Sequence, residues 1–544
     1  MGKELSAAFD AGFGKFVLEH SGDDVSRLVL GRGKWPGVDV DAAVTAIECR
    51  KKIRTKLPEW YAVPEIVYPD RICAEQSSSS ETAAYKAGVA ERIMREFSSG
   101  EMRAADLTGG LGVDSLAFSR VASRVLYNEM DSARASAAVH NFRLLGAGGR
   151  IEVSSCCVTP DAQEFWDRLK SFSPSLIYAD PARRSASGSK VFLLEDCSPD
   201  ILTLLPRIFS IAPNLLLKVS PMADLSMLAA RVGEYGASVV EAHVVAAAGE
   251  CKELLLLVKP SPCGSSRLFV NEGGHLLSVD AGAGCAGADS GYVPVFMESP
   301  EQLMSAAYLF EPGKALAKAG LFNAVCSLFT TSRNIPAAPS APSSAAPSGC
   351  PAAPSVVSSA ASSGCPAAPV YPEHFSESAP FCAAGSRSVH PEHSADPALS
   401  EYSAQASTSH SGLVMCSGLS GRVVKAGRST HLYFTDAEPS ADCTMPRMAD
   451  FGKMFRILEI LPLDKRSIKA FSAKYPRAEV SARNIPMSSD ELRKKLKVSS
   501  GGDVHIFGFR ADFCADSSAH SDSADFRASC SPQSANFLLA ASRL

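Results

Sequence analysis

The apolar positions of residues 1–100 recur at the spacing of helices, and the best-marked helix comes last. Apolar side chains occupy every fourth position from Tyr85 to Phe97, which places them on one face of a helix. Ser78 and Glu81 lie three residues apart just ahead of this run, the spacing of a capping box at a helix start. The pattern therefore predicts a helical N-terminal region whose last helix packs on the domain that follows.

Between residues 101 and 260 the pattern changes to short apolar runs separated mostly by segments of helix length. Such alternation predicts a mostly parallel sheet covered by helices on both faces. The last two runs lie too close together for an intervening helix, which predicts an antiparallel hairpin at one edge of the sheet. The seven runs occupy residues 102–107, 124–128, 150–154, 175–179, 214–219, 238–245 and 253–258.

The rest of the chain divides by composition. Residues 261–334 predict a smaller mixed unit with a helix around Ser305–Phe329. Residues 335–412 are rich in Ala, Ser and Pro. Because such a stretch cannot bury enough apolar surface to offset its ordering entropy, we expect a disordered insertion there. Order is expected again over 413–513, and the Ser- and Ala-rich residues 514–544 are expected to form a flexible tail.

Composition and charge exclude some classes of function. Of 544 residues, 46% are hydrophobic and 21% are charged, which supplies several cores and excludes a wholly disordered chain. The net charge of −4 excludes a nucleic-acid binder that works by bulk charge. Residues 464–497 nevertheless hold 10 basic and 4 acidic residues, which predicts either a phosphate-binding surface or an ordinary solvated helix face. The basic residues of this stretch include Lys465, Arg466, Lys469, Arg493, Lys494, Lys495 and Lys497.

Membrane and metal chemistry are not expected. No apolar run reaches the length of a membrane span, and the N-terminus lacks a hydrophobic signal core, so we expect a cytoplasmic protein without membrane contact. The 16 cysteines include no C-x-x-C pair, and no short spacing groups four ligands, so we expect no metal site. The sequence leaves the oligomeric state open.

A glycine-rich string follows the first predicted strand and opens a helix. It reads A-A-D-L-T-G-G-L-G-V-D over residues 104–114. Glycine at 110 and 112 lets the backbone turn tightly and approach a ligand without side-chain obstruction, and amides at the helix start face that ligand. The spacing is D-x-x-x-G-x-G rather than the G-x-G-x-x-G of dinucleotide enzymes. With its leading acid and the terminal hairpin, the pattern favours a site for S-adenosylmethionine.

An acid also ends the second predicted strand. Glu129 lies 23 residues after Asp106, the distance needed to cross one helix and reach the tip of the neighbouring strand. A carboxylate there can accept hydrogen bonds from both ribose hydroxyls of a nucleoside. The alternative role for Glu129 is to help begin the next helix, although Asp131 can supply that cap.

These motifs give the sequence a family resemblance. It resembles class I S-adenosylmethionine-dependent methyltransferases, particularly a bacterial group of RNA methyltransferases with a THUMP-like C-terminal domain. Thr108 stands where the usual first glycine would be, a departure shared with several RNA methyltransferases. The resemblance spans nearly everything except the insertion and the tail. It is carried by D-L-T-G-G-L-G-V-D (106–114), N-E-M-D (128–131), Y-A-D-P-A-R-R (178–184), E-D-C-S-P-D (195–200), L-K-V-S-P (217–221), L-F-E-P-G-K-A (309–315) and R-N-I-P with R-K-K-L-K-V-S-S-G-G-D (483–503).

The resemblance implies an α/β fold with a Rossmann-like, seven-stranded methyltransferase domain over 101–260. It further implies small α+β domains behind it, ferredoxin-like over 261–334 and THUMP-like, RNA-binding, over 413–513. The residues expected to hold S-adenosylmethionine are Asp106, Thr108, Gly109, Gly110, Gly112 and Glu129.

The reacting end is expected where the fourth strand runs into Asp180 and Pro181, because ligands bind beyond the carboxyl ends of parallel strands. Enzymes that methylate amino groups commonly have D/N-P-P-aromatic at this place, whereas this chain has Ala182 and Arg183 after the Asp-Pro pair. Methylation of an exocyclic amine is therefore in doubt. Carbon-5 methylation of pyrimidines is disfavoured too, because the cysteine that activates the ring is absent. Arg183 can hold a substrate phosphate or pair with a downstream acid.

A second chemistry fits the spacing of four ionisable residues. Ribose 2′-hydroxyl methyltransferases use a Lys-Asp-Lys-Glu tetrad in which a lysine helps to deprotonate the hydroxyl. Lys86, Asp180, Lys218 and Glu253 occur here in that order and with similar spacing. The alternatives are an ordinary ion pair between Lys218 and Glu253, and a solvated Lys86.

We therefore expect an S-adenosylmethionine-dependent methyltransferase that acts on RNA, either tRNA or rRNA. Asp180, Arg183 and Lys218 are the expected catalytic residues, with Asp180 orienting the acceptor. Two other functions remain open at this point. One is a nucleotide-dependent oxidoreductase, and the other is an RNA-binding protein whose methyltransferase fold has lost activity.

Overall fold

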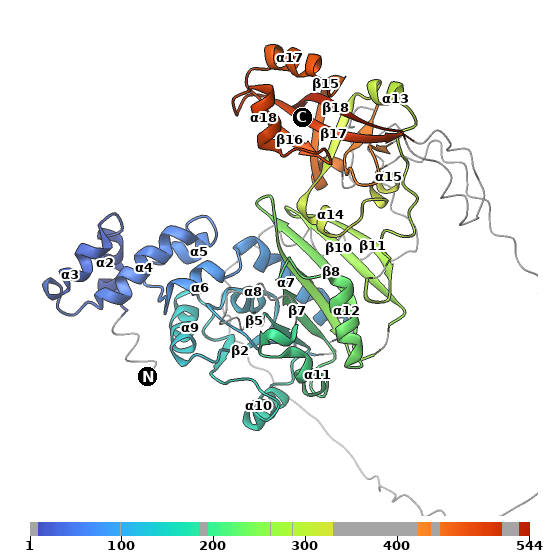
Figure 1. Cartoon of the computed structure of the whole chain (residues 1–544). Coiled ribbons are helices and arrows are strands. Elements are labelled where there is room, and N and C mark those ends of the chain that lie inside the picture. Colours follow the sequence, from blue (N-terminus) through green and yellow to red (C-terminus); the bar gives the residue numbers. More distant parts are fainter. Residues whose placement is uncertain are drawn as a thin grey trace, which may run out of the picture. The chain divides into compact units, whose positions relative to one another are not determined.

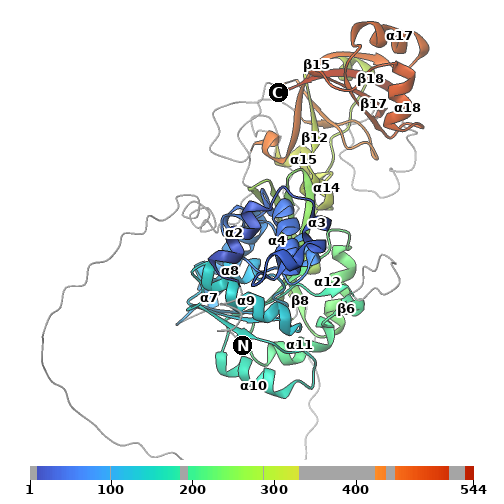
Figure 2. The same ribbon diagram turned by 90° about the vertical axis from the view of Figure 1, so that its left-hand side faces the viewer.

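The computed structural model describes residues 9–97, 100–183, 194–261, 263–285, 287–329, 423–436, 447–513 and 533–544. The insertion that we expected over 335–412 lies outside these ranges. Figures 1 and 2 show the chain from two directions.

Residues 9–97 are helical, as the sequence predicts. Aspartate begins four of the helices: the side chains of Asp10, Asp24, Asp39 and Asp70 each accept a backbone N–H in the first turn, which satisfies donors that lack a partner within the helix. The helices are α2 (Ala11–Glu19), α3 (Val25–Leu30), α4 (Val40–Ile53), α5 (Pro58–Tyr61), α6 (Arg71–Gln76) and α7 (Ser80–Phe97), with a 3₁₀ turn at Arg32–Lys34.

Helix α7 is the helix predicted from the four-residue repeat, but its cap differs. Ser79, not Ser78, accepts the N–H of Thr82, at 3.1 Å. The helix therefore starts one residue later than the expected capping box. Ser78 is instead buried and bonds within the site described below. At the other end of the helix, Phe97 is 46% exposed and does not join the buried face.

The central sheet contains all seven predicted strands. Strands β1, β2, β3, β4 and β7 run parallel, and β9 runs antiparallel to both β7 and β8. They span β1 (Arg103–Asp106), β2 (Arg124–Asn128), β3 (Ile151–Ser154), β4 (Leu176–Ala179), β7 (Leu215–Val219), β8 (Ser238–Ala247) and β9 (Glu250–Lys259). The helices between them are α8 (Val113–Val121), α9 (Ser132–Leu144), α10 (Gln163–Phe172), α11 (Ile201–Phe209) and α12 (Leu225–Glu234).

The sheet continues beyond residue 260, where we expected this domain to end. Strand β10 (Ser265–Glu272) pairs parallel to β8, and β11 (His275–Gly282) pairs antiparallel to β10. The strand order is β11-β10-β8-β9-β7-β4-β1-β2-β3, and Figure 1 shows β8, β10 and β11 side by side. The β8–β9 hairpin is thus internal and not at the edge. Minor elements are β5 (Ala182–Arg183), β6 (Cys197–Ser198) and the 3₁₀ turns Leu194–Asp196 and Ala283–Cys285.

The helix predicted around Ser305–Phe329 is wrong. The segment forms strand β12 (Tyr308–Pro312) and two short helices, α14 (Lys314–Lys318) and α15 (Ala324–Leu328), after α13 (Pro300–Met304). Proline at 312 has no N–H to donate within a helix, and Gly320 ends α14 with a φ of +72°. The apolar positions of this segment, which are spaced like one face of a helix, therefore belong to the separate elements β12, α14 and α15.

A second sheet combines residues that we assigned to two domains. Its order is β13-β14-β12-β15-β18-β17-β16, so β12 from the expected 261–334 domain pairs with strands of the expected 413–513 domain. The strands are β13 (Val424–Lys425), β14 (Tyr433–Thr435), β15 (Gly452–Pro462), β16 (Glu479–Arg483), β17 (Val504–Phe513) and β18 (Gln533–Arg543). Helix α17 (Lys465–Lys474) follows β15, α18 (Ser489–Leu496) precedes β17, and a 3₁₀ turn spans Met448–Phe451.

The last strand corrects the expected flexible tail over residues 533–543, while residues 514–532 of that tail lie outside the described ranges. Strand β18 lies between β15 and β17 and pairs antiparallel with both. Its alternate residues bury on opposite faces: Phe537 and Leu539 join one apolar cluster, and Leu538 and Ala540 join another. A strand that is buried on both faces has a continuous apolar sequence. In β18 this apolar run is short, and the Ser- and Ala-rich residues around it make it hard to recognise.

None of the described helices combines the length and the apolar character needed to cross a lipid bilayer.

Candidate active site

The glycine loop connects β1 to α8 in a backbone shape that requires glycine. Gly110 and Gly112 have φ values of +55° and +93°, a region that residues with a Cβ rarely adopt. A Cβ on Gly109 would lie 2.1 Å from the ring of Tyr127, and one on Gly112 would lie 2.6 Å from Phe142. The loop therefore keeps its shape only with glycine at these positions.

Asp106, at the end of β1, fixes the start of this loop. Its carboxylate accepts the N–H of Thr108 at 3.0 Å and the hydroxyl of Ser115 at 2.6 Å. Burial raises the pKa of Asp106 to about 7, although these two hydrogen bonds oppose the shift. Thr108 in turn accepts the N–H of Asp180 on its hydroxyl oxygen, at 2.6 Å. Thr108 thereby joins the glycine loop to the end of β4.

Glu129, at the end of β2, bonds back to the same loop. One carboxylate oxygen accepts the N–H of Gly110 and the other accepts the N–H of Asp131, both at 2.9 Å. Asp131 caps α9 through Ala133 and Arg134, so Glu129 is not needed as the cap. Each Glu129 oxygen keeps a further lone pair, which suits the acceptance of two vicinal hydroxyls.

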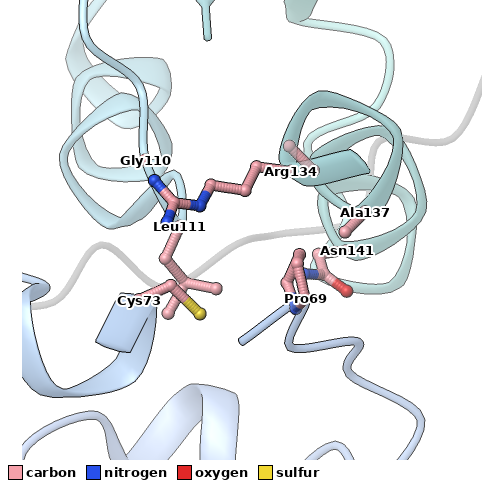
Figure 3. Close-up of a pocket in the computed structure, with 8 residues that line it drawn as sticks. Pro69, Cys73, Gly110, Leu111, Arg134, Ala137 and Asn141 are labelled. Atoms are coloured by element: carbon pink, nitrogen blue, oxygen red, sulfur yellow. The ribbon is translucent and has the colours of Figure 1, made fainter. Parts of the chain in front are cut away.

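A small hollow lies behind the glycine loop (Figure 3). It leaves no room for even one water molecule, whereas small-molecule sites have volumes of roughly 300 Å³ or more. The side chain of Arg134 extends from α9 across it toward Gly110, and its guanidinium pairs with Asp70 at 2.8 Å. The hollow is therefore a packing gap between the N-terminal helices and α9, bridged by an ion pair, and we assign no ligand to it.

Asp180 and Lys218 meet at the carboxyl ends of β4 and β7. The Lys218 Nζ lies 2.5 Å from the Asp180 carboxylate and 3.9 Å from the Glu253 carboxylate. The Asp180 side chain is 36% exposed and that of Lys218 is 15% exposed. This pair is thus the part of the charged cluster that a substrate can reach.

Behind this pair, Lys86 of α7 is completely buried. Its Nζ donates to both oxygens of Glu253 at 2.9 Å and lies 3.2 Å from Asp114. The structure thus brings together all four members of the tetrad suggested by the sequence. The alternative of a solvated Lys86 is wrong, because this side chain is fully buried. Lys218 does pair with Glu253, and it also pairs with Asp180.

Sequence reasoning missed three further members of the cluster. Asp114, in the first turn of α8, accepts hydroxyl hydrogens from Ser78 at 2.9 Å and Tyr178 at 2.8 Å, and Ser78 also accepts a hydrogen bond from Lys86. The acid directly after the glycine loop was the available signal for Asp114. An acidic residue in the first turn of a helix is, however, favoured by the helix dipole in any protein. The position of Asp114 alone therefore does not identify it as a member of the cluster.

The buried charges hold one another in defined protonation states. Burial alone would lower the pKa of Lys218, but Asp180 and Glu253 outweigh it and raise that pKa. Burial likewise opposes the ionisation of Asp114, yet Lys86 and Lys218 lower its pKa. The pKa of Glu253 is raised, chiefly by burial. At neutral pH, Lys218 is therefore an ammonium ion held between carboxyl groups.

Two other expected features are Arg183, which the structure describes only in part, and the basic surface of residues 464–497. Arg183 lies in β5 and pairs with Cys197 of β6, while its side chain lies outside the described residues. The expected basic surface lies on α17 and α18, where most of its side chains are exposed. Only Arg493 among those predicted is half-buried, and it pairs with Asp490 at 3.3 Å.

Comparison with solved structures identifies the fold. A provisionally named methyltransferase from Porphyromonas gingivalis W83 aligns over 99% of this chain and 98% of its own, with a TM-score of 0.64 and 24% identity. The chain has a methyltransferase fold. Residues 452–514 also match the family model described as THUMP domain-like, as the sequence resemblance predicts. The methyltransferase fold is thus joined to a THUMP-like segment made of β15, α17, β16, α18 and β17.

Two further solved structures align with only part of this chain. A Streptococcus pneumoniae protein provisionally named a tRNA (m1A22) methyltransferase is 14% identical over 31% of this chain and 68% of its own, with a TM-score of 0.23. A SAM-dependent methyltransferase from Agrobacterium tumefaciens is 18% identical over 34% of this chain and 61% of its own, also with a TM-score of 0.23. Among curated proteins, none matches this chain.

Proposed function

We propose that this chain is an S-adenosylmethionine-dependent RNA methyltransferase that modifies a nucleotide of tRNA or rRNA. The observation that best supports the proposal is the hydrogen bond from the Asp180 N–H to Thr108. It sets the half-buried Asp180–Lys218 pair beside the glycine loop, so a donor bound at the loop and an acceptor bound at Asp180 would meet.

The residues around the loop fit such a cofactor. Glu129 would accept the ribose hydroxyls, and the glycine backbone would lie against the remainder of the ligand. Asp106 would face the methionine end, where the ligand's ammonium group would favour ionisation of this carboxyl. When bound, S-adenosylmethionine supplies an electrophilic methyl group. The chain's own part is to orient the acceptor at Asp180 and to receive its proton.

RNA is the proposed substrate because of the basic surface on the THUMP-like segment. Lys465, Arg466 and Lys469 of α17 are exposed, as are Lys494 and Lys495 of α18. The ion pairs found among the described residues include none of these five, so their charges are available to phosphate groups. Electrostatic attraction of this kind is independent of sequence and depends on salt.

We predict that replacing Glu129 with Gln weakens binding of S-adenosylhomocysteine at least about tenfold. Hydrogen bonds to a charged group contribute roughly 1.5–3 kcal/mol, and the amide keeps the shape of the side chain but not its charge. Isothermal titration calorimetry with S-adenosylhomocysteine measures the change, and NADH is titrated in parallel.

The control for this prediction is Asp131→Asn, which alters a neighbouring carboxylate that caps α9. This variant should bind S-adenosylhomocysteine like the original chain. Binding of NADH without binding of S-adenosylhomocysteine would favour the oxidoreductase instead and overturn the proposal.

Methyl transfer itself is tested on RNA from cells in which the gene is deleted. Radiolabelled S-adenosylmethionine should transfer label to one RNA class from those cells and not to the same class from the parent. Mass spectrometry of nucleosides from both strains should show one methylated nucleoside missing after deletion. Tight cofactor binding without any RNA methylation would instead support the inactive RNA-binding protein.

We predict that reversing three charges on the basic surface lowers the affinity for RNA and also makes this affinity less dependent on salt. In the variant Lys469→Glu, Lys494→Glu and Lys495→Glu, the slope of log K against log salt should fall by about 2–3, since each phosphate contact contributes roughly 0.7–0.9. Filter binding of the target RNA at several salt concentrations measures both quantities.

The matched control carries the same change of charge elsewhere. Lys34, Lys51 and Lys170 are exposed and lie outside the THUMP-like segment. Their replacement by Glu should leave the slope within about 0.5 of the original, since these lysines make no proposed phosphate contact. Equal effects of the two triple variants would show that net charge, not this surface, attracts RNA.

A further inference from the structure

The charged cluster below Asp180 is ordered by depth. Lys86 is 0% exposed, Glu253 3%, Asp114 11%, Lys218 15% and Asp180 36%, each for its side chain. Only the last two can touch a substrate. Among the three deeper residues, Glu253 contacts Lys218 directly, at 3.9 Å. Lys86 binds Glu253 and Asp114 in turn, so all three are positioning residues.

We propose that the group methylated is a hydroxyl, the 2′-hydroxyl of an RNA ribose, and that Lys218 and Asp180 act on it directly; this inference rests on the proposed function. The geometry behind it is the direct contact of one ammonium and one carboxylate, 2.5 Å apart, at the only substrate-accessible end of the cluster within the described residues.

An ammonium beside the acceptor suits oxygen rather than an amine. A hydroxyl oxygen becomes more negative as it loses its proton, and a preorganised cation stabilises that developing charge. An exocyclic amine has no such need, because its nitrogen attacks with a lone pair that a neighbouring ammonium would draw away. Amine acceptors are instead served by carboxylate and carbonyl oxygens together with a stacked ring, and Ala182 stands where Pro would precede that ring.

The buried residues keep Lys218 charged and in position. Lys86 forms hydrogen bonds with both Glu253 oxygens, which fixes the Glu253 carboxylate on the inner side of Lys218. Asp180 holds the same ammonium from the outer side. Counting Lys86 and Lys218 against Asp114, Asp180 and Glu253 gives a net charge of −1 when all are ionised. A positively charged methyl donor would offset this excess.

The step balances without any additional reagent. The hydroxyl oxygen bonds to the methyl carbon as the carbon–sulfur bond breaks with its electron pair retained by sulfur, and the hydroxyl proton passes to the Asp180 carboxylate. The products are a 2′-methyl ether, a neutral thioether and one proton, which Asp180 releases to solvent.

The position of the methyl group tests this inference by alkaline hydrolysis. Alkali cleaves RNA through the free 2′-hydroxyl, so a 2′-methylated nucleotide stays linked to its neighbour. Target RNA labelled by the full-length chain and S-adenosylmethionine should yield its label in dinucleotides. Mass spectrometry should then find the methyl group on the ribose fragment of the nucleoside.

The outcomes separate this inference from the proposed function. Label in mononucleotides, with the methyl group on the base, would overturn the hydroxyl acceptor and leave the RNA methyltransferase standing. No label in any RNA would overturn the proposed function itself.

A variant of Lys218 gives an independent readout. Lys218→Met should reduce methyl transfer at least about 100-fold, the lower range for removing a preorganised group that stabilises developing charge, while S-adenosylhomocysteine still binds. Lys218→Arg should restore part of the rate, because it returns a cation to the site. Full activity of Lys218→Met would contradict the inference, since an amine acceptor needs no ammonium.

Discussion

Replacing Asp180 with Asn should greatly slow methyl transfer while leaving cofactor binding nearly unchanged. The carboxylate is the most exposed member of the charged cluster and accepts a hydrogen bond from Lys218 at 2.5 Å. An amide cannot take the acceptor's proton, so we expect a loss of about 100-fold to 10,000-fold in rate. The link to the cofactor loop uses the backbone N–H of residue 180 and the Thr108 hydroxyl, which the substitution keeps.

Two measurements on the same preparation check this result. Single-turnover transfer of a labelled methyl group to target RNA gives the rate, and calorimetry with S-adenosylhomocysteine gives the affinity. Asp161→Asn, at an exposed position before α10, serves as the control and should match the original chain in both. Retained turnover in Asp180→Asn would refute the role of Asp180 in orienting the acceptor and accepting its proton.

The convergence of the candidate site residues could be largely predicted because most of them lie at strand ends. In a parallel sheet the carboxyl ends of successive strands meet at one edge. Asp106 ends β1, Glu129 and Asp180 directly follow β2 and β4, and Lys218 is the last residue but one of β7. Their convergence therefore follows once the strands are recognised. Lys86 lies outside the sheet, and its burial depends on how α7 packs against the domain, which its helical pattern alone does not give.

The parts that could not be predicted depend on contacts between distant segments. Strand β18 pairs with β15 and β17, and its own residues are mainly small or polar at the ends of a short apolar run. Strand β12 likewise pairs with β14 and β15 across the long insertion. Local composition assigned these segments to a tail and to a helix, because pairing over such distances leaves no periodic signal in either segment.

Replacing Lys86 with Met should destabilise the methyltransferase fold by about 3–5 kcal/mol, the usual cost of removing one partner from a buried ion pair. The side chain is fully buried, and its ammonium is the nearest cation to Glu253. Methionine fills similar space, so the loss reflects charge rather than a cavity. Glu253 and Asp114 would then share Lys218 as their only remaining cation among the described cluster.

The dependence on pH distinguishes this cause from a general packing defect. Without Lys86, the folded-state pKa of Glu253, already raised by burial, should rise further. A carboxyl group whose pKa is higher in the folded protein than in the unfolded chain binds more protons in the folded state. Its contribution to the stability of the fold is therefore fully present below the pKa of the unfolded chain and is lost as the pH rises through the folded-state pKa. The deficit of Lys86→Met should therefore be larger at pH 8 than at pH 5, as measured by urea denaturation at both values.

Two further variants complete the experiment. Lys51→Met, at an exposed position on α4, should change stability by less than about 0.5 kcal/mol. Adding Glu253→Gln to Lys86→Met should recover part of the loss at pH 8, because the amide is neutral and leaves one carboxylate fewer to compensate. A deficit that is the same at both pH values, and that the second substitution does not reduce, would show that Lys86 acts through packing. In that case the charge of Lys86 would not be needed to keep Lys218 between Asp180 and Glu253.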